Sequence, residues 1–141
     1  MRDYFEGLNI IDLISEKHAL LRKKVIETWI SRGEESISDT ETYVLALIER
    51  ENMTVSQIGR TIGISRQGAH KCVKGLIERG YIQLEDPNSI HRDKKLLLTE
   101  KGTRFCKETL ALKKEFEEEI KNSLGEEKFK ILKDSLNKKW L

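Results

Sequence analysis

Five polar side chains that can form hydrogen bonds to a nucleic acid lie within nine consecutive residues. They are Arg66, Gln67, His70, Lys71 and Lys74. Arginine can donate two parallel hydrogen bonds to guanine, and glutamine can pair in a similar two-bond way with adenine. Lysine carries a compact charge that suits a phosphate oxygen. No acidic residue occurs between Glu51 and Glu78, although 35% of the chain is charged. The chemistry predicted for this stretch is therefore recognition of double-stranded DNA.

The surrounding residues predict a helix-turn-helix that would position these side chains. Thr54 and Gln57 have the spacing of a capping box at the start of a short helix. Gly63 suits a left-handed turn at its end, and Ser65 suits the N-cap of the next helix, which we expect over residues 66–79. Its inner face would consist of Ala69, Val73, Leu76 and Ile77. The second helix of such a motif enters the major groove with its N-terminal part nearest the bases.

A hairpin is expected directly after this helix. Residues 81–84 and 95–98 are strand-like runs, and a polar loop separates them. Arg92 at the loop tip is a candidate for a narrow minor groove, where the negative potential is enhanced. His91 and Lys94 would flank it. Thr54 and Ser65, at helix starts, complete the expected DNA contacts because free backbone N–H groups there favour phosphate.

The basic face of the second helix and the basic hairpin also have ordinary structural explanations. A basic helix face is often just solvated, and a charged hairpin is often just exposed. The cap, the turn, the gap in acidic residues and the hairpin occur together, and this combination favours DNA binding. Charge distribution agrees: the net charge is +2 overall, but residues 53–102 hold nine basic and five acidic residues.

Amphipathic helices are expected on both sides of this motif. The first covers residues 8–32, with apolar positions at Ile10, Leu13, Ile14, Leu21, Val25 and Trp29. A capping box at Ser38 and Glu41 would open the next, with Thr40, Val44, Leu47 and Ile48 buried. Two further helices follow Thr99, separated by Gly125. We expect the first and the last two helices to pack together against a second copy of the chain, although completing a monomeric core is the alternative.

Several classes of function are not indicated. The chain has no apolar run long enough to span a membrane and no signal-peptide pattern at its N-terminus, so a cytoplasmic protein is expected. It lacks a nucleophile-elbow, phosphate-loop or zinc-protease motif, so no catalytic residue and no enzyme are predicted. The three histidines have no zinc-ligand spacing, so no metal and no cofactor are predicted. Cys72 and Cys106 are expected to be buried and inert, with oxidation of Cys72 as the alternative.

Residues 53–102 resemble the DNA-binding core of the MarR (multiple antibiotic resistance regulator) family. The similarity is carried by the helix-turn-helix at residues 54–67, the junction at residues 76–82, and the Leu98-Thr99-Glu100-Lys101-Gly102 sequence after the basic hairpin. The family commonly has an Asp two residues before the hairpin Arg, where this chain has Ile90. The flanking helices are similar to the family's layout over nearly the whole chain.

This resemblance implies a mainly α fold with a small β hairpin, built as a winged helix-turn-helix domain with N- and C-terminal dimerisation helices. The expected division is residues 1–35 and 103–141 for dimerisation and residues 36–102 for DNA. The implied function is a homodimeric transcription regulator, usually a repressor, on a pseudo-palindromic operator. A small-molecule effector is a further implied partner, and Trp29 and Tyr43 are candidates to line its pocket or, alternatively, to be core residues. A winged-helix protein-interaction module without specific DNA binding is the rival hypothesis.

Overall fold

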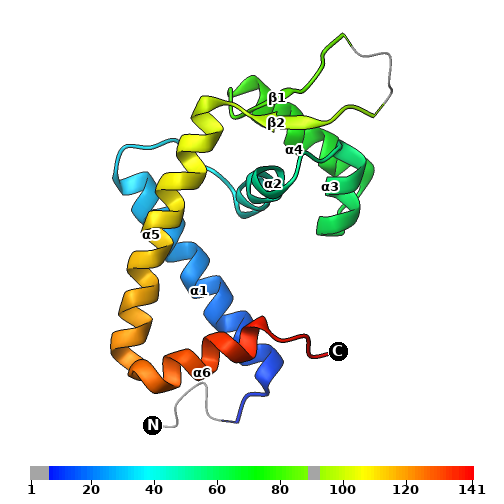
Figure 1. The fold of residues 1–141 in the computed structure, drawn as a ribbon. Helices are drawn as coiled ribbons and strands as arrows, with labels where there is room; N and C mark the ends of the chain where they lie inside the picture. The colour runs from blue at the N-terminus through cyan, green and yellow to red at the C-terminus, as the bar shows by residue number, and fades with distance from the viewer. Residues whose placement is uncertain (1–6, 89–92) are drawn as a thin grey trace. The chain divides into compact units, whose positions relative to one another are not determined.

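The computed structural model describes residues 7–88 and 93–141, which form six helices and a two-stranded antiparallel sheet (Figure 1). In chain order the elements are α1 (Ile10–Ser31), α2 (Asp39–Arg50), α3 (Val55–Ile62), α4 (Arg66–Glu78), β1 (Ile82–Leu84), β2 (Leu96–Leu98), α5 (Glu100–Leu124) and α6 (Glu126–Asn137). The predicted mainly α fold with one small hairpin is confirmed.

The chain divides into two compact units, Met1–Cys106 and Lys107–Leu141, with the boundary inside α5. The first unit holds α1 to β2 and the first turns of α5, and so it contains the whole helix-turn-helix and its hairpin. The second unit holds the rest of α5 and α6, which an ion pair of 2.6 Å between Lys133 and Glu117 connects.

The helices of the first unit begin where the sequence predicts caps. Ser38 and Glu41 form a complete capping box at the start of α2, and Thr54 and Gln57 form another at the start of α3. The Ser65 hydroxyl accepts a hydrogen bond from the Gly68 backbone N–H at 3.0 Å, as an N-cap of α4 should. These three predictions are confirmed, and they fix where the helices of the motif start.

The turn between α3 and α4 depends on a glycine in the left-handed region. Gly63 has a φ of +81° and its N–H donates to the Gly59 carbonyl. A side chain at this φ would clash with the backbone, so glycine makes the tight reversal possible. Gly59 supports the same turn from within α3, because a Cβ there would lie 3.3 Å from Ala69 Cβ on α4. The two helices of the motif therefore pack closely.

The C-terminal end of α4 is closed by a Schellman motif. The Tyr81 N–H donates to the Leu76 carbonyl and the Gly80 N–H donates to the Ile77 carbonyl, with Gly80 at a φ of +84°. This arrangement satisfies carbonyls that the end of a helix otherwise leaves free. It also turns the chain directly from α4 into β1.

The hairpin is anchored to the motif through the backbone. β1 and β2 pair antiparallel with Ile82 opposite Leu98 and Leu84 opposite Leu96. The segment before α3 joins their edge, because Leu96 N–H donates to the Met53 carbonyl and Thr54 bridges to Lys95. The base of the hairpin is therefore tied to the start of α3.

The core of the first unit lies among α2, α3, α4, the hairpin and the ends of α1 and α5. Its fully buried side chains include Val44, Leu45, Ile58, Leu76, Ile82 and Leu96. Thr40, which we expected in the buried stripe of α2, is exposed because the stripe begins one turn later at Val44. Ile77, expected on the inner face of α4, is 38% exposed beside the hairpin.

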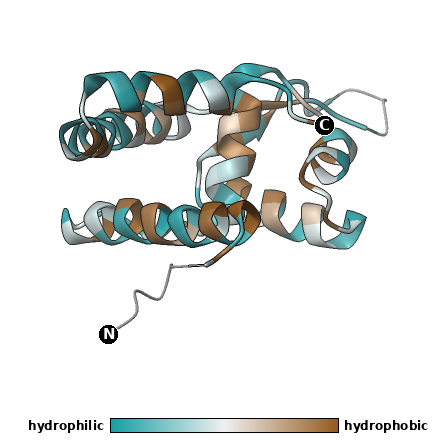
Figure 2. Ribbon diagram, turned by 90° about the horizontal axis from the view of Figure 1, so that it is seen from below, coloured by the Kyte–Doolittle hydropathy of each residue, from teal (hydrophilic) through white to brown (hydrophobic). Residues whose placement is uncertain are grey.

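Apolar side chains remain exposed on α1 and on α6. Ile10 and Ile14, which belong to the apolar stripe expected for the first helix, are 67% and 39% exposed in the single chain. On α6, Leu132 and Leu136 are 43% and 55% exposed, and no residue of this helix is buried. Trp140, which is 56% exposed, lies beyond the end of α6 at Asn137. Figure 2 shows hydrophobic and hydrophilic segments alternating along the helices. Across residues 7–88 and 93–141, no helix meets the length and hydropathy that a membrane crossing requires.

Candidate nucleic-acid interface

One face of α4 presents a row of polar and basic side chains to solvent. The structure confirms that Arg66, Gln67, His70, Lys71 and Lys74 are all exposed, while Ala69, Val73 and Leu76 face the core. The first turn of α4 contains no acidic residue. Since the N-terminal end of a helix carries partial positive charge, this end of α4 attracts anions without local opposition.

The two predicted hydroxyl contacts differ in their exposure. Ser65 is exposed at the N-terminus of α4, so a phosphate can approach its hydroxyl and the neighbouring backbone N–H groups. Thr54 is 8% exposed, and its hydroxyl accepts from the Gln57 N–H at 3.2 Å. The Thr54 side chain thus acts as a cap in this structure, with its backbone tied to the hairpin.

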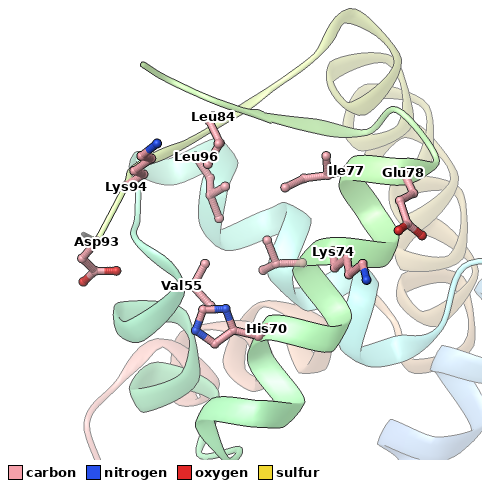
Figure 3. Close-up of a pocket in the computed structure, with 10 residues that line it drawn as sticks. Val55, His70, Lys74, Ile77, Glu78, Leu84, Asp93, Lys94 and Leu96 are labelled. Carbon is pink, nitrogen blue, oxygen red and sulfur yellow. The ribbon is translucent and has the colours of Figure 1, made fainter. Parts of the chain in front are cut away.

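A groove of about 420 Å³ separates α4 from the hairpin (Figure 3). Apolar side chains form much of its lining, among them Val55, Ile77, Leu84 and Leu96. His70 and Lys74 lie along the α4 side of the groove, and Asp93 and Lys94 lie along the hairpin side, as Figure 3 shows. The partly exposed position of Ile77 is explained by this groove.

Asp93 and Lys94, in the described part of the hairpin loop, each make a polar contact. The Ser56 hydroxyl on α3 donates to Asp93 Oδ1 at 3.4 Å, which links the loop to the first turn of α3. Lys94 is half-buried, and its ammonium donates to the Pro87 carbonyl at 2.8 Å. An ammonium has three donors, so this bond does not use up its capacity to contact phosphate. The predicted contacts His91 and Arg92 lie outside the described residues.

Sequence reasoning missed a carboxylate that holds the far end of α4. Glu35, in the loop between α1 and α2, accepts from Arg79 Nε at 2.5 Å, from Tyr81 Oη at 2.9 Å and from Lys101 Nζ at 3.2 Å. Arg79 also pairs with Glu41 on α2 at 2.6 Å and donates to the Ser36 carbonyl. No local pattern signals these contacts, because 44 residues separate Glu35 from Arg79 along the chain.

The charges of this cluster shift the titration of its members. The hydrogen bond from Arg79 lowers the pKa of Glu35 to about 2, with further lowering by Tyr81 and Lys101 against the opposing effect of burial. Burial raises the pKa of Tyr81 to about 12, and its hydrogen bond to Glu35 acts in the same direction. Glu35 is therefore a carboxylate, and Tyr81 a neutral donor, across the physiological pH range.

The two candidate pocket aromatics have different environments. Trp29 is 3% exposed, packs edge-on against Phe105 at a centroid distance of 5.2 Å, and donates from Nε1 to the Glu35 carbonyl at 3.2 Å. Tyr43 on α2 is 46% exposed. In this structure Trp29 is a core residue, whereas the Tyr43 ring is accessible to a ligand.

The cysteines offer little reactivity. Cys106 is buried, and its thiol lies 3.9 Å from the Leu45 carbonyl. Cys72 is half-buried, and burial raises the pKa of its thiol, with Glu41 adding to the effect. A raised pKa disfavours the thiolate, which is the reactive form. Within residues 7–88 and 93–141, no three His, Cys, Asp or Glu side chains are grouped to hold a metal ion.

Comparisons with known proteins agree with this geometry. Residues 36–89, which span α2 to the start of the hairpin loop, match the model of the MarR family. The HTH-type transcriptional regulator TcaR of Staphylococcus aureus is 28% identical over 130 residues, which cover 90% of this chain and 82% of TcaR. The chain is therefore similar to MarR-family regulators, most directly over its helix-turn-helix and the start of the hairpin.

Solved structures of other proteins share the fold of this chain. The crystal structure of the S. aureus MepR–DNA complex has a TM-score of 0.70 at 15% identity, covering 92% of this chain and 94% of MepR. NadR in complex with 4-hydroxyphenylacetate has a TM-score of 0.67 at 23% identity, covering 96% of this chain and 95% of NadR. These likenesses show a winged helix-turn-helix fold for this chain, with α4 in the place of the second helix of the motif and the hairpin in the place of the wing.

Proposed function

We propose that this protein is a homodimeric repressor of MarR type that reads a pseudo-palindromic DNA site with α4. One observation carries the proposal: α4 begins with a capped, acid-free turn and exposes Arg66, Gln67, His70, Lys71 and Lys74 along one face. Arg66 and Gln67 lie nearest the N-terminus, so they are the base-reading residues. Phosphates are contacted by Ser65, Lys71 and Lys74. The adjacent groove is contacted by three residues of the wing, His91, Arg92 and Lys94.

The homodimer follows from the apolar side chains that one chain leaves exposed. Ile10 and Ile11 on α1, Leu136 on α6, and Trp140 just after α6 are each more than half exposed. Covering such side chains is favourable by about 25 cal/mol for each Å² of apolar surface removed from water. A symmetric pair would present two recognition helices to successive major grooves, about 34 Å apart for half-sites separated by one helical turn.

We also propose that the protein acts on transcription and responds to a small molecule. TcaR is named as a transcriptional regulator, and the chain carries the same type of motif. We propose control of transcription by DNA binding in the cytoplasm rather than by catalysis. NadR was solved with 4-hydroxyphenylacetate, and by analogy a small-molecule effector is proposed here. The accessible Tyr43 is the stronger candidate pocket residue, and Trp29, which is buried in this structure, is the second.

Selection of duplexes from a random pool by the wild-type protein tests the proposal. A pseudo-palindromic consensus is expected, and light scattering of the free protein should give the mass of a dimer. A monomer that selects no sequence, even at low ionic strength, would contradict the proposal. If that monomer instead formed a stable complex with another protein, the interaction-module alternative would hold.

Two variants, Arg66→Ala and Lys74→Ala, test whether one residue reads bases and the other contacts phosphate. They form a matched pair because each removes one positive charge from the same helix face. Arg66→Ala should lower affinity for the selected duplex by about 1–3 kcal/mol and leave affinity for random duplex much less affected. Lys74→Ala should weaken binding to both duplexes similarly and reduce the slope of log affinity against log salt by about one. Equal losses on both duplexes for Arg66→Ala would refute its base-reading role.

A further inference from the structure

The C-terminal end of the recognition helix is held by a carboxylate outside the winged domain's own helices and strands. Glu35 lies in the loop between α1 and α2. Its backbone carbonyl accepts a hydrogen bond from Trp29 Nε1, which fixes the backbone of that loop. Its Oε1 accepts from Arg79, the C-cap residue of α4. Its Oε2 accepts from Tyr81 and Lys101. One side chain thus joins the end of α4, the residue that leads into β1, and the first turn of α5.

The three partners of Glu35 also contact one another. Lys101 Nζ donates to the Arg79 carbonyl at 2.7 Å and lies 4.3 Å from the centroid of the Tyr81 ring. The Arg79 guanidinium lies 5.4 Å from the same centroid. Two cations therefore lie close to one aromatic ring, and an anion that contacts both offsets their mutual repulsion. Glu35 is that anion, and Glu41 shares Arg79 from the α2 side.

This cluster lies where the recognition helix and the wing diverge. Arg79 ends α4 and Tyr81 precedes β1, with Gly80 between them as a left-handed hinge. A change in the direction of the chain at residues 79–81 would alter the angle between α4 and the hairpin, and with it the simultaneous fit of both to DNA. The Schellman motif fixes the backbone hydrogen bonds of this turn but does not connect it to α1, α2 or α5.

We propose that Glu35 is a positioning residue for DNA recognition, which sets the orientation of α4 relative to the wing through Arg79, Tyr81 and Lys101. This inference rests on the proposed function, because it assumes that α4 and the wing bind DNA together. Glu35 itself does not contact DNA. Its loss leaves the recognition side chains in place but lets the two DNA-binding elements move relative to each other, so specific binding suffers more than non-specific binding.

The neighbouring Glu34 provides a matched control. Its carboxylate pairs with Arg104 on α5 at 3.2 Å, and both side chains belong to the same unit as the cluster. Glu34→Gln and Glu35→Gln remove the same charge from adjacent positions of one loop. If charge alone mattered, both variants would bind DNA slightly more tightly, because each removes a negative charge that repels phosphate.

The test measures the affinity of both variants for a duplex selected by the wild-type protein and for a scrambled duplex of the same composition. We expect Glu35→Gln to reduce the ratio of selected to scrambled affinity on the order of tenfold, as the loss of a charged hydrogen bond implies. Glu34→Gln should leave this ratio unchanged. An unchanged ratio in Glu35→Gln, or an equal change in both variants, would overturn the proposal.

A second variant keeps the test valid if Glu35→Gln folds poorly. Tyr81→Phe removes one hydroxyl donor to Glu35 and keeps the ring that packs on Phe105 at 5.9 Å. It should reduce the affinity ratio in the same direction and by less, with a cooperative thermal transition retained. A purely structural role would lower the melting temperature of these variants without changing the ratio. Failure of the wild-type protein to select any duplex would instead refute the proposed function itself.

Discussion

Gly102 is the residue at which the family-like Leu-Thr-x-x-Gly sequence has its clearest physical basis. A Cβ at Gly102 would overlap the Tyr81 carbonyl oxygen and would lie 3.2 Å from Leu98 Cδ2. Neighbouring bonds hold that carbonyl in place, because it accepts from the Thr99 N–H at 3.0 Å. The absence of a side chain therefore allows α5 to begin directly against the turn between α4 and the wing.

We expect Gly102→Ala to lower the free energy of unfolding by about 1–3 kcal/mol, since overpacking against backbone is not relieved by rotamer changes. Urea denaturation measures this. Gly75→Ala on α4 is the control, because a Cβ there meets nothing within 4 Å. That variant should be more stable by up to about 1 kcal/mol, since alanine favours a helix over glycine. A neutral Gly102→Ala would contradict the close approach.

Glu35 predicts a pH dependence of stability at the residue scale. Its folded pKa is lowered from 4.5 to about 2, so the ionised form is favoured in the folded state. The resulting stabilisation is fully present above pH 4.5 and is lost as the pH falls from there toward 2. The difference in unfolding free energy between the wild type and Glu35→Gln should therefore shrink over this range. A difference that does not vary with pH would show that the carboxylate charge is not responsible.

At the scale of elements, the start of the recognition helix combines a structural and a binding role. Ser65 caps α4 as Ser38 caps α2, each through its hydroxyl to a backbone N–H three residues later. Ser65→Ala and Ser38→Ala should each lower the unfolding free energy by about 1 kcal/mol. We expect Ser65→Ala alone to weaken binding to selected duplex as well. Equal DNA affinity of the two variants would argue against a phosphate contact at Ser65.

The elements themselves were largely predictable, and the reasons are local. Caps at Ser38, Thr54 and Ser65 depend on hydrogen bonds three residues away, and the turn at Gly63 depends on one φ angle. Such features leave a signature in a few consecutive residues. The buried residues of each helix were predicted less accurately. Thr40 and Ile77 are exposed, because burial depends on which neighbouring element covers each face of a helix.

At the scale of the whole molecule, the uncovered apolar face of α6 predicts an association that can be disrupted. Leu132→Glu should convert the proposed dimer into a monomer in sedimentation velocity and weaken binding to a palindromic duplex more than to a single half-site. Asn137→Glu is the control, because it adds the same charge on an exposed residue of the same helix. Dissociation in both variants would indicate charge repulsion, and dissociation in neither would place the dimer contacts elsewhere.

The sequence by itself determined the helix-turn-helix, its caps and the chemistry of its exposed face, because each depends on residues close together in the chain. Tertiary structure decided the rest. Trp29 is a core residue whose indole N–H donates to the Glu35 carbonyl. The polar cluster of Glu35, Arg79, Tyr81 and Lys101 joins segments up to 66 residues apart. Contacts of this kind depend on how helices pack, and neither periodicity nor composition encodes which distant side chains will meet.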